Sequence, residues 1–248
     1  MQPVKTLRQL AAAVQFMTRI PMPAFRFEPE MVLDAAKFYP VVGALVALGA
    51  IGIERGLRSH LAPMVTALAV LAYLVIITGG FHEDGLADTA DALGGGWTQP
   101  RMLEIMHDSR IGSFGTLAIC LSLLARWALL STMPVARFPL YLLTAHVLCR
   151  WTTLPLGAFV GSARSDGLGA KLAHKIPLTS AAIGTLLAFL IAGWALRMGA
   201  ILPIVAVSLI TLLSGLYFRS QIGGITGDCF GTTNQLAEIA VYVCGVWA

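Results

Sequence analysis

The run LAPMVTALAVLAYLVIITGGF at residues 61–81 is followed at once by HEDGLADTADALGGG at residues 82–96. The first segment contains no charged side chain and is as long as the ~20 residues that a helix needs to cross the hydrocarbon layer of a membrane. The second segment places four carboxylates directly after it. This order predicts a membrane-spanning helix that leads into a short acidic helix.

The composition of the whole chain agrees with a membrane protein. Apolar residues make up 57% of the chain and charged residues only 12%, whereas soluble domains carry ~25% charged residues. Uncharged or nearly uncharged runs recur at 176–196, 198–218, 38–53, 111–133 and 138–160, with a possible last one at 235–248. We therefore predict an all-α, polytopic integral membrane helical bundle with six or seven transmembrane helices, forming a single membrane-embedded domain over 1–248.

The first 17 residues predict a helix that lies in the membrane interface. Their apolar residues follow helical spacing, and Lys5 and Arg8 occupy the other positions. If this end lies in the cytoplasm, eleven Lys and Arg side chains fall in cytoplasmic loops, and only Arg55, Arg58, Arg137 and Arg197 in the opposite loops. This agrees with the positive-inside bias. It predicts a multi-pass protein of the bacterial cytoplasmic (inner) membrane, with its amino terminus and active site facing the cytoplasm.

The acidic segment carries the strongest chemical signal. Successive helical residues rotate by ~100°, so Asp84, Asp88 and Asp91 share one stripe, with Glu83 beside it. Like charges on one stripe destabilise a helix unless cations compensate them. Mg²⁺ prefers oxygen ligands, usually one or two carboxylates together with substrate phosphates. The stripe predicts a Mg²⁺ site, and the alternative is a solvated acidic helix face.

Two further segments carry cations suited to phosphate. In residues 106–115, Asp108 is a candidate to add a metal ligand or to hold Arg110, whose planar fork suits phosphate oxygens. An interfacial ion pair is the alternative for these two residues. In residues 163–171, Arg164 and Lys171 lie among glycines, which suits phosphate binding but also a cytoplasmic loop.

The segment at residues 223–238 predicts a break between two helices, because glycines and threonines interrupt the apolar pattern. Asp228, Asn234 and Glu238 supply oxygen ligands or hydrogen bonds there. Glu238 has apolar neighbours, a setting in which an ionisable group is costly and usually functional. The alternative is a buried hydrogen bond that only packs helices. The four cysteines show no metal-type pairing and are expected to be buried.

Together these motifs resemble the cobalamin synthase family, the adenosylcobinamide-GDP ribazoletransferases, also called cobalamin-5′-phosphate synthases. The segments that carry the resemblance are 80–94, 108–112 and 226–231, with support from 18–21, 38–43 and 163–169. The resemblance implies a Mg²⁺-dependent transferase that joins adenosylcobinamide-GDP to α-ribazole or its 5′-phosphate and releases GMP. For this chemistry our hypothesis gives the metal to Asp84, Asp88 and Asp91, with Glu83 or Asp108 completing or orienting the shell. Arg110 and Arg164 would hold phosphates, and Asp228 or Glu238 would accept the hydroxyl proton or hold a second ion.

Membrane lipid is the expected surrounding and nucleic acid is not an expected partner. A homo-oligomer, or association with other late enzymes of cobalamin biosynthesis, remains open.

Two other functions remain possible. Another Mg²⁺-dependent membrane transferase, of the CDP-alcohol or prenyl type, needs similar acids, although its motifs differ from those in this chain. A transporter also places carboxylates beside spans, but residues 1–124 and 125–248 share no repeated motif.

Overall fold

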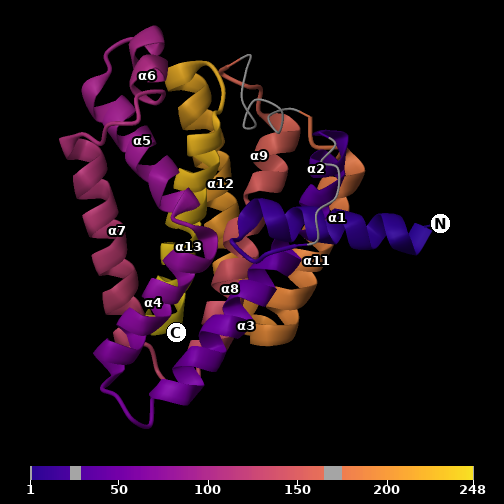
Figure 1. Cartoon of the computed structure of the whole chain (residues 1–248), viewed down its shortest axis with the longest axis vertical. Coiled ribbons are helices and arrows are strands. Elements are labelled where there is room, and N and C mark those ends of the chain that lie inside the picture. The colour runs from indigo at the N-terminus through magenta and orange to yellow at the C-terminus, as the bar shows by residue number, and fades with distance from the viewer. Residues whose placement is uncertain (1, 23–28, 165–174, 248) are drawn as a thin grey trace.

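The computed structural model describes residues 2–22, 29–164 and 175–247, which form helices joined by short connections (Figure 1). The described part of the chain contains no strand, only an isolated bridge between Ser162 and Ile225. The all-α prediction is confirmed. The helices are α1 Gln2–Met17, α2 Pro29–Ala35, α3 Tyr39–Leu57, α4 Pro63–Thr78, α5 Phe81–Gly95, α6 Gln99–Ile105, α7 Ser113–Thr132, α8 Phe138–Trp151, α9 Thr153–Phe159, α11 Leu178–Leu196, α12 Ile201–Ile222 and α13 Gly227–Trp247, with 3-10 turns η1 Ala36–Phe38 and η2 Arg197–Ala200.

A sharp bend separates the apolar helix α4 from the acidic helix α5. Gly79 and Gly80 both adopt left-handed backbone conformations, with φ of 71° and 70°, which glycine reaches without the steric cost that a Cβ imposes. The two helices meet at 86°. The expected continuous span over 61–81 is therefore wrong in extent, because α4 ends at Thr78 after 16 residues. The bend turns the carboxylates of α5 away from the direction of α4.

Among the described residues, three segments are long and apolar enough to cross a membrane: Met31–Leu57, Ser113–Thr132 and Leu178–Ile222. The bent pair α4 and α5 adds a fourth if it counts as one span. Leu178–Ile222 has 45 residues, which is ~68 Å of straight helix against a hydrocarbon layer of ~30 Å. It also contains Arg197 at a φ of 52°, between α11 and α12. The chain is thus suited to a membrane, and the number of spans remains a prediction.

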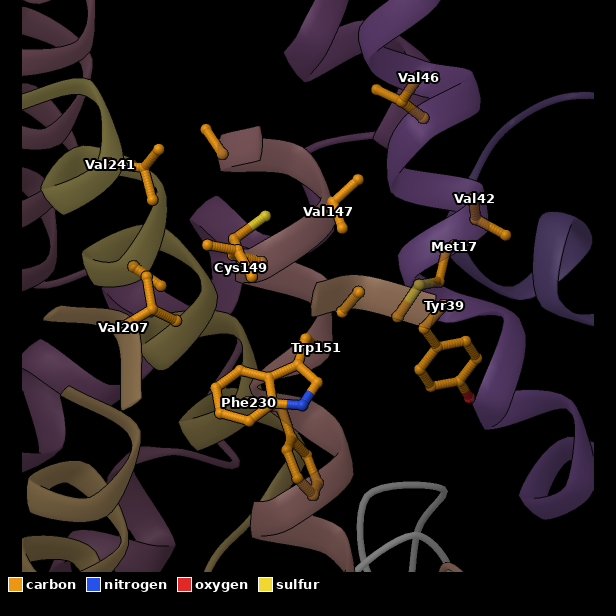
Figure 2. Close-up of a cluster of buried hydrophobic side chains, with 14 of the residues drawn as sticks. Met17, Tyr39, Val42, Val46, Val147, Cys149, Trp151, Val207, Phe230 and Val241 are labelled. Carbon is orange, nitrogen blue, oxygen red and sulfur yellow. The ribbon is translucent and has the colours of Figure 1, made fainter. Parts of the chain in front are cut away.

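Helix α13 lies inside the bundle, where it packs against α5, α8, α12 and α7 (Figure 1). Apolar side chains from distant parts of the sequence meet around it. Figure 2 shows members of this core from α1, α3, α8, α12 and α13, among them Met17, Val42, Val147, Val207 and Val241. Helix α1 forms as expected and runs crosswise to most of the long helices (Figure 1). Cys149, Cys229 and Cys244 are buried, but Cys120 is exposed, contrary to the expectation.

Candidate active site

The acidic stripe forms on helix α5 as predicted, and its members differ in exposure. Asp84 is exposed, Asp88 is half-buried and Asp91 is buried. Glu83 is also buried, since one residue of helical rotation turns it toward the interior of the bundle. The four acids that are neighbours in sequence therefore face different surroundings.

The predicted helix break is confined to residues 223–226. Gly223 takes a left-handed conformation with a φ of 77°, and α13 begins at Gly227. The break is therefore shorter than the segment 223–238 in which we expected it, and Asn234 and Glu238 lie four residues apart on regular helix. Asp228 lies in the first turn of α13, where the Thr226 hydroxyl donates a hydrogen bond to its Oδ2 at 3.1 Å. Negative charge is stabilised at this end of a helix.

Close backbone contact brings the start of α13 against α5. A Cβ on Gly85 would lie 2.9 Å from the carbonyl oxygen of Asp228 and 3.0 Å from its Cα. The Thr232 hydroxyl donates to the carbonyl oxygen of Gly85 at 3.0 Å and ties the two helices together. The tertiary fold thereby joins Asp84 and Asp88 with Asp228, which is far away in the sequence.

The charges around these carboxylates are unbalanced. The negative charges of Asp228, Asp84 and Asp91 all act on the Asp88 carboxylate, and Arg164 opposes them. Arg164 is held by a hydrogen bond from its Nη2 to the carbonyl oxygen of Leu103 at 2.9 Å. Burial raises the pKa of the Asp228 carboxyl, while the Thr226 hydrogen bond and the Arg164 charge lower it. Lys171, the other expected phosphate ligand, lies outside the described residues.

Asp91 has a structural partner that the sequence did not reveal. Its Oδ2 accepts the backbone N–H of Gly112 at 2.7 Å and its Oδ1 that of Gly115 at 2.8 Å. These N–H groups belong to the first turn of α7, where helices have no internal acceptors for them. A Cβ on either glycine would collide with the Asp91 carboxylate. Asp91 therefore caps α7, and its role at a metal remains a prediction.

Asp108 and Arg110 form an ion pair on the surface. Arg110 Nη2 lies 2.6 Å from Asp108 Oδ2, and the two side chains are 87% and 38% exposed. Hydrogen bonds from Arg110 lower the pKa of the Asp108 carboxyl to about 2. This arrangement is the interfacial ion pair considered above, and both the phosphate role of Arg110 and the metal role of Asp108 remain predictions.

A second group of charged side chains lies inside the bundle. Arg126 of α7 is 1% exposed, and its Nη2 lies 2.9 Å from Glu83 Oε1 while its Nη1 lies 3.5 Å from Glu238 Oε1. Gln235 also donates to Glu83 Oε1, at 3.4 Å. Sequence reasoning assigned no function to Arg126, although a single arginine within an apolar span is itself a signal of a buried partner.

His146, Cys149 and Glu238 lie near enough to one another to hold a metal ion, but their surroundings favour a hydrogen-bonded network. Arg150 Nη1, which can only donate, lies 3.1 Å from His146 Nδ1, so that nitrogen accepts. His146 Nε2 then carries the proton and donates to Tyr242 Oη at 3.1 Å. Both ring nitrogens are therefore engaged. Asn234 is buried beside this group, and its Nδ2 has no hydrogen-bond partner among the described residues.

The apolar segments and the carboxylates at one end of the bundle define a helical membrane protein with an acidic polar site. The chain belongs to the cobalamin-5-phosphate synthase family, whose model matches residues 9–246. It is 38% identical over 240 residues to the adenosylcobinamide-GDP ribazoletransferase of Ralstonia nicotianae, covering 94% of this chain and 93% of that protein. The enzyme of the same name from Mesorhizobium japonicum is 40% identical, with 97% and 93% covered. No solved structure matches the chain.

Proposed function

We propose that the protein joins adenosylcobinamide-GDP to α-ribazole, or to α-ribazole 5′-phosphate, and releases GMP. The observation that carries the proposal is that the charges of Asp84, Asp228 and Arg164 all act on Asp88, in a chain of this family. Relatives that align over more than nine-tenths of both chains carry the name of this activity.

The donor set fits a hard divalent cation. Asp84, Asp88 and Asp228 offer only oxygen atoms, and among the described residues the carboxylates that act on Asp88 outnumber the guanidinium of Arg164. These three residues would hold Mg²⁺, and Glu83 and Asp91, which have protein partners, are the less favoured candidates of the predicted set. When bound, Mg²⁺ supplies a Lewis acid that neutralises phosphate oxygens.

The protein's own side chains supply binding and proton transfer. A ribose hydroxyl attacks the phosphorus that remains with the cobinamide, and the bond to GMP breaks. Transfer at such a diphosphate depends mainly on positioning and on charge stabilisation. The half-buried Arg164 is placed to bind phosphate oxygens. Where Asp228 does not hold the cation, it would accept the hydroxyl proton, because burial raises the pKa of its carboxyl. Glu238 is the weaker candidate, because it is 2% exposed and pairs with Arg126.

Placement in the cytoplasmic membrane, with the site facing the cytoplasm, is part of the proposal. It is supported by the excess of Lys and Arg in loops on that side. Counting α11 and α12 as two spans, because of the break at Arg197, raises the candidate spans among the described residues to five when α4 and α5 form one span. Helices α8 and α13 would complete the six or seven crossings that we propose.

The test is incubation of purified protein with adenosylcobinamide-GDP, α-ribazole 5′-phosphate and Mg²⁺, followed by mass spectrometry of GMP. GMP that forms only with all three components, and that is lost with EDTA, supports the proposal. No GMP where the Ralstonia nicotianae enzyme produces it would contradict the proposal. Movement of corrinoids or ions into liposomes without GMP release would favour a transporter instead.

A further inference from the structure

Arg126 is the one side chain among the described residues whose ion pairs bridge α5 and α13. It lies within α7, and its two terminal nitrogens point to carboxylates on different helices. Glu83 belongs to α5 and Glu238 to α13. A planar guanidinium suits this bridge because its N–H donors are fixed in a rigid fork.

The surroundings of Arg126 leave little freedom for another arrangement. Arg126 and Glu238 are 1% and 2% exposed, and Arg150 nearby is 1% exposed. Arg126 pairs with both Glu83 and Glu238, whereas Arg150 contacts His146 and forms no ion pair within the described part of the chain. Breaking one pair would leave a buried charge without a partner, which is strongly unfavourable. The group therefore favours one relative position of α5 and α13.

That relative position also determines the geometry of the acidic site. Glu83 immediately precedes Asp84 on α5, so the backbone that holds one holds the other. Gly85, the next residue, is the point where α5 contacts the backbone of Asp228. A small slide of α5 along α13 would change the separation of Asp84 and Asp88 from Asp228.

We propose that Arg126 is a positioning residue, which fixes the register of α5 against α13 and thereby sets the spacing of the carboxylates that hold the divalent cation. This inference rests on the proposed function for its biological meaning. Arg126 does not touch the reacting groups. It acts through Glu83 and Glu238, in the way that residues hydrogen-bonded to the ligands of a metal orient those ligands.

The experiment compares Arg126→Lys with Arg150→Lys. Both variants keep the buried positive charge, and both native arginines are 1% exposed, but only Arg126 pairs with a carboxylate on α5. The compact ammonium of lysine cannot reproduce the fork that reaches two carboxylates. Binding of Mn²⁺, as a spectroscopic substitute for Mg²⁺, is titrated by electron paramagnetic resonance, and the Mg²⁺ dependence of GMP release is measured in parallel.

For Arg126→Lys we expect Mn²⁺ to bind on the order of tenfold more weakly, with turnover largely recovered at high Mg²⁺. For Arg150→Lys we expect Mn²⁺ affinity close to that of the wild type. Wild-type Mn²⁺ affinity in Arg126→Lys, or an equal loss in both variants, would overturn the inference. If Arg126→Lys does not fold, Glu238→Gln, which alters the other partner of Arg126, must weaken Mn²⁺ binding in the same direction. Normal Mn²⁺ binding without GMP from the wild type would instead count against the proposed function.

Discussion

Glu83 and Asp84 are adjacent in the sequence, yet they belong to two charged regions with opposite properties. Asp84 lies with Asp88 and Asp228 where, among the residues that the structure describes, negative charge exceeds positive charge. Glu83 lies in the buried group, where Arg126 compensates it at 2.9 Å. One step of helical rotation separates an acid available for a ligand from an acid used by the protein. We call these the open acidic site and the buried charge group.

The difference shows how the same residue types serve two tasks. A carboxylate without a compensating positive charge is stabilised by binding a cation. A carboxylate that already has an ion-pair partner in the interior is stabilised little by one. Burial alone therefore does not identify the functional acids. The balance of neighbouring charge within the described residues is the better guide, and it favours Asp84, Asp88 and Asp228 as the acids of the proposed site.

The largest effect is expected from Asp88→Asn in the open acidic site. The change removes a charged metal ligand without changing its size, and should lower turnover roughly 10³-fold, about 4 kcal/mol of transition-state stabilisation. Turnover is measured as GMP release, with folded protein checked by size-exclusion chromatography. Glu104→Gln, which alters an exposed ion pair with Arg101, serves as the control. Normal turnover in Asp88→Asn would refute the metal role.

Glu238→Gln tests the buried charge group. Removal of one partner from a buried pair costs about 3 kcal/mol of stability, so thermal unfolding in detergent should occur at a clearly lower temperature. Because glutamine keeps a carbonyl acceptor for Arg126, turnover at saturating Mg²⁺ should fall by less than about tenfold. A loss of turnover as large as that of Asp88→Asn would move Glu238 into the open acidic site.

Gly85→Ala tests the contact that joins α5 to Asp228. The added Cβ would press on the Asp228 backbone at 2.9 Å, and overpacking of this kind costs about 2 kcal/mol. We expect lower stability together with weaker Mn²⁺ binding. Gly52→Ala is the matched control, because nothing lies within 4 Å of a Cβ there. That control should be neutral or slightly stabilising, as alanine favours helix. Equal behaviour of the two variants would show that the contact does not position Asp228.

Asp91→Ala is expected to have the smallest effect of the four. It removes the acceptor for two N–H groups of α7, and loss of such a cap costs about 1 kcal/mol. Asp91→Asn keeps one acceptor oxygen and should restore part of the stability, as measured by thermal unfolding. Weakened Mn²⁺ binding in a stable Asp91→Asn protein would instead support the metal role that the sequence predicted.

Sequence periodicity correctly predicted the helix that carries Asp84, Asp88 and Asp91, because side-chain positions on one helix follow from local geometry. It did not predict that α4 ends at Thr78. In the sequence, Gly79 and Gly80 are only two small residues in an apolar run, and their left-handed backbone conformation is seen only in the structure. It also overextended the break before α13. Tertiary packing stabilises helix there despite several glycines and threonines.

The sequence alone determined that the chain is helical and suited to a membrane, and that an acidic stripe follows an apolar helix. These features depend on composition and on the spacing of near neighbours. Only the tertiary structure decided which acids stay free and which acquire partners. Asp228, Arg126 and the first turn of α7 reach α5 from distant segments, and pairing between such segments depends on how whole helices pack.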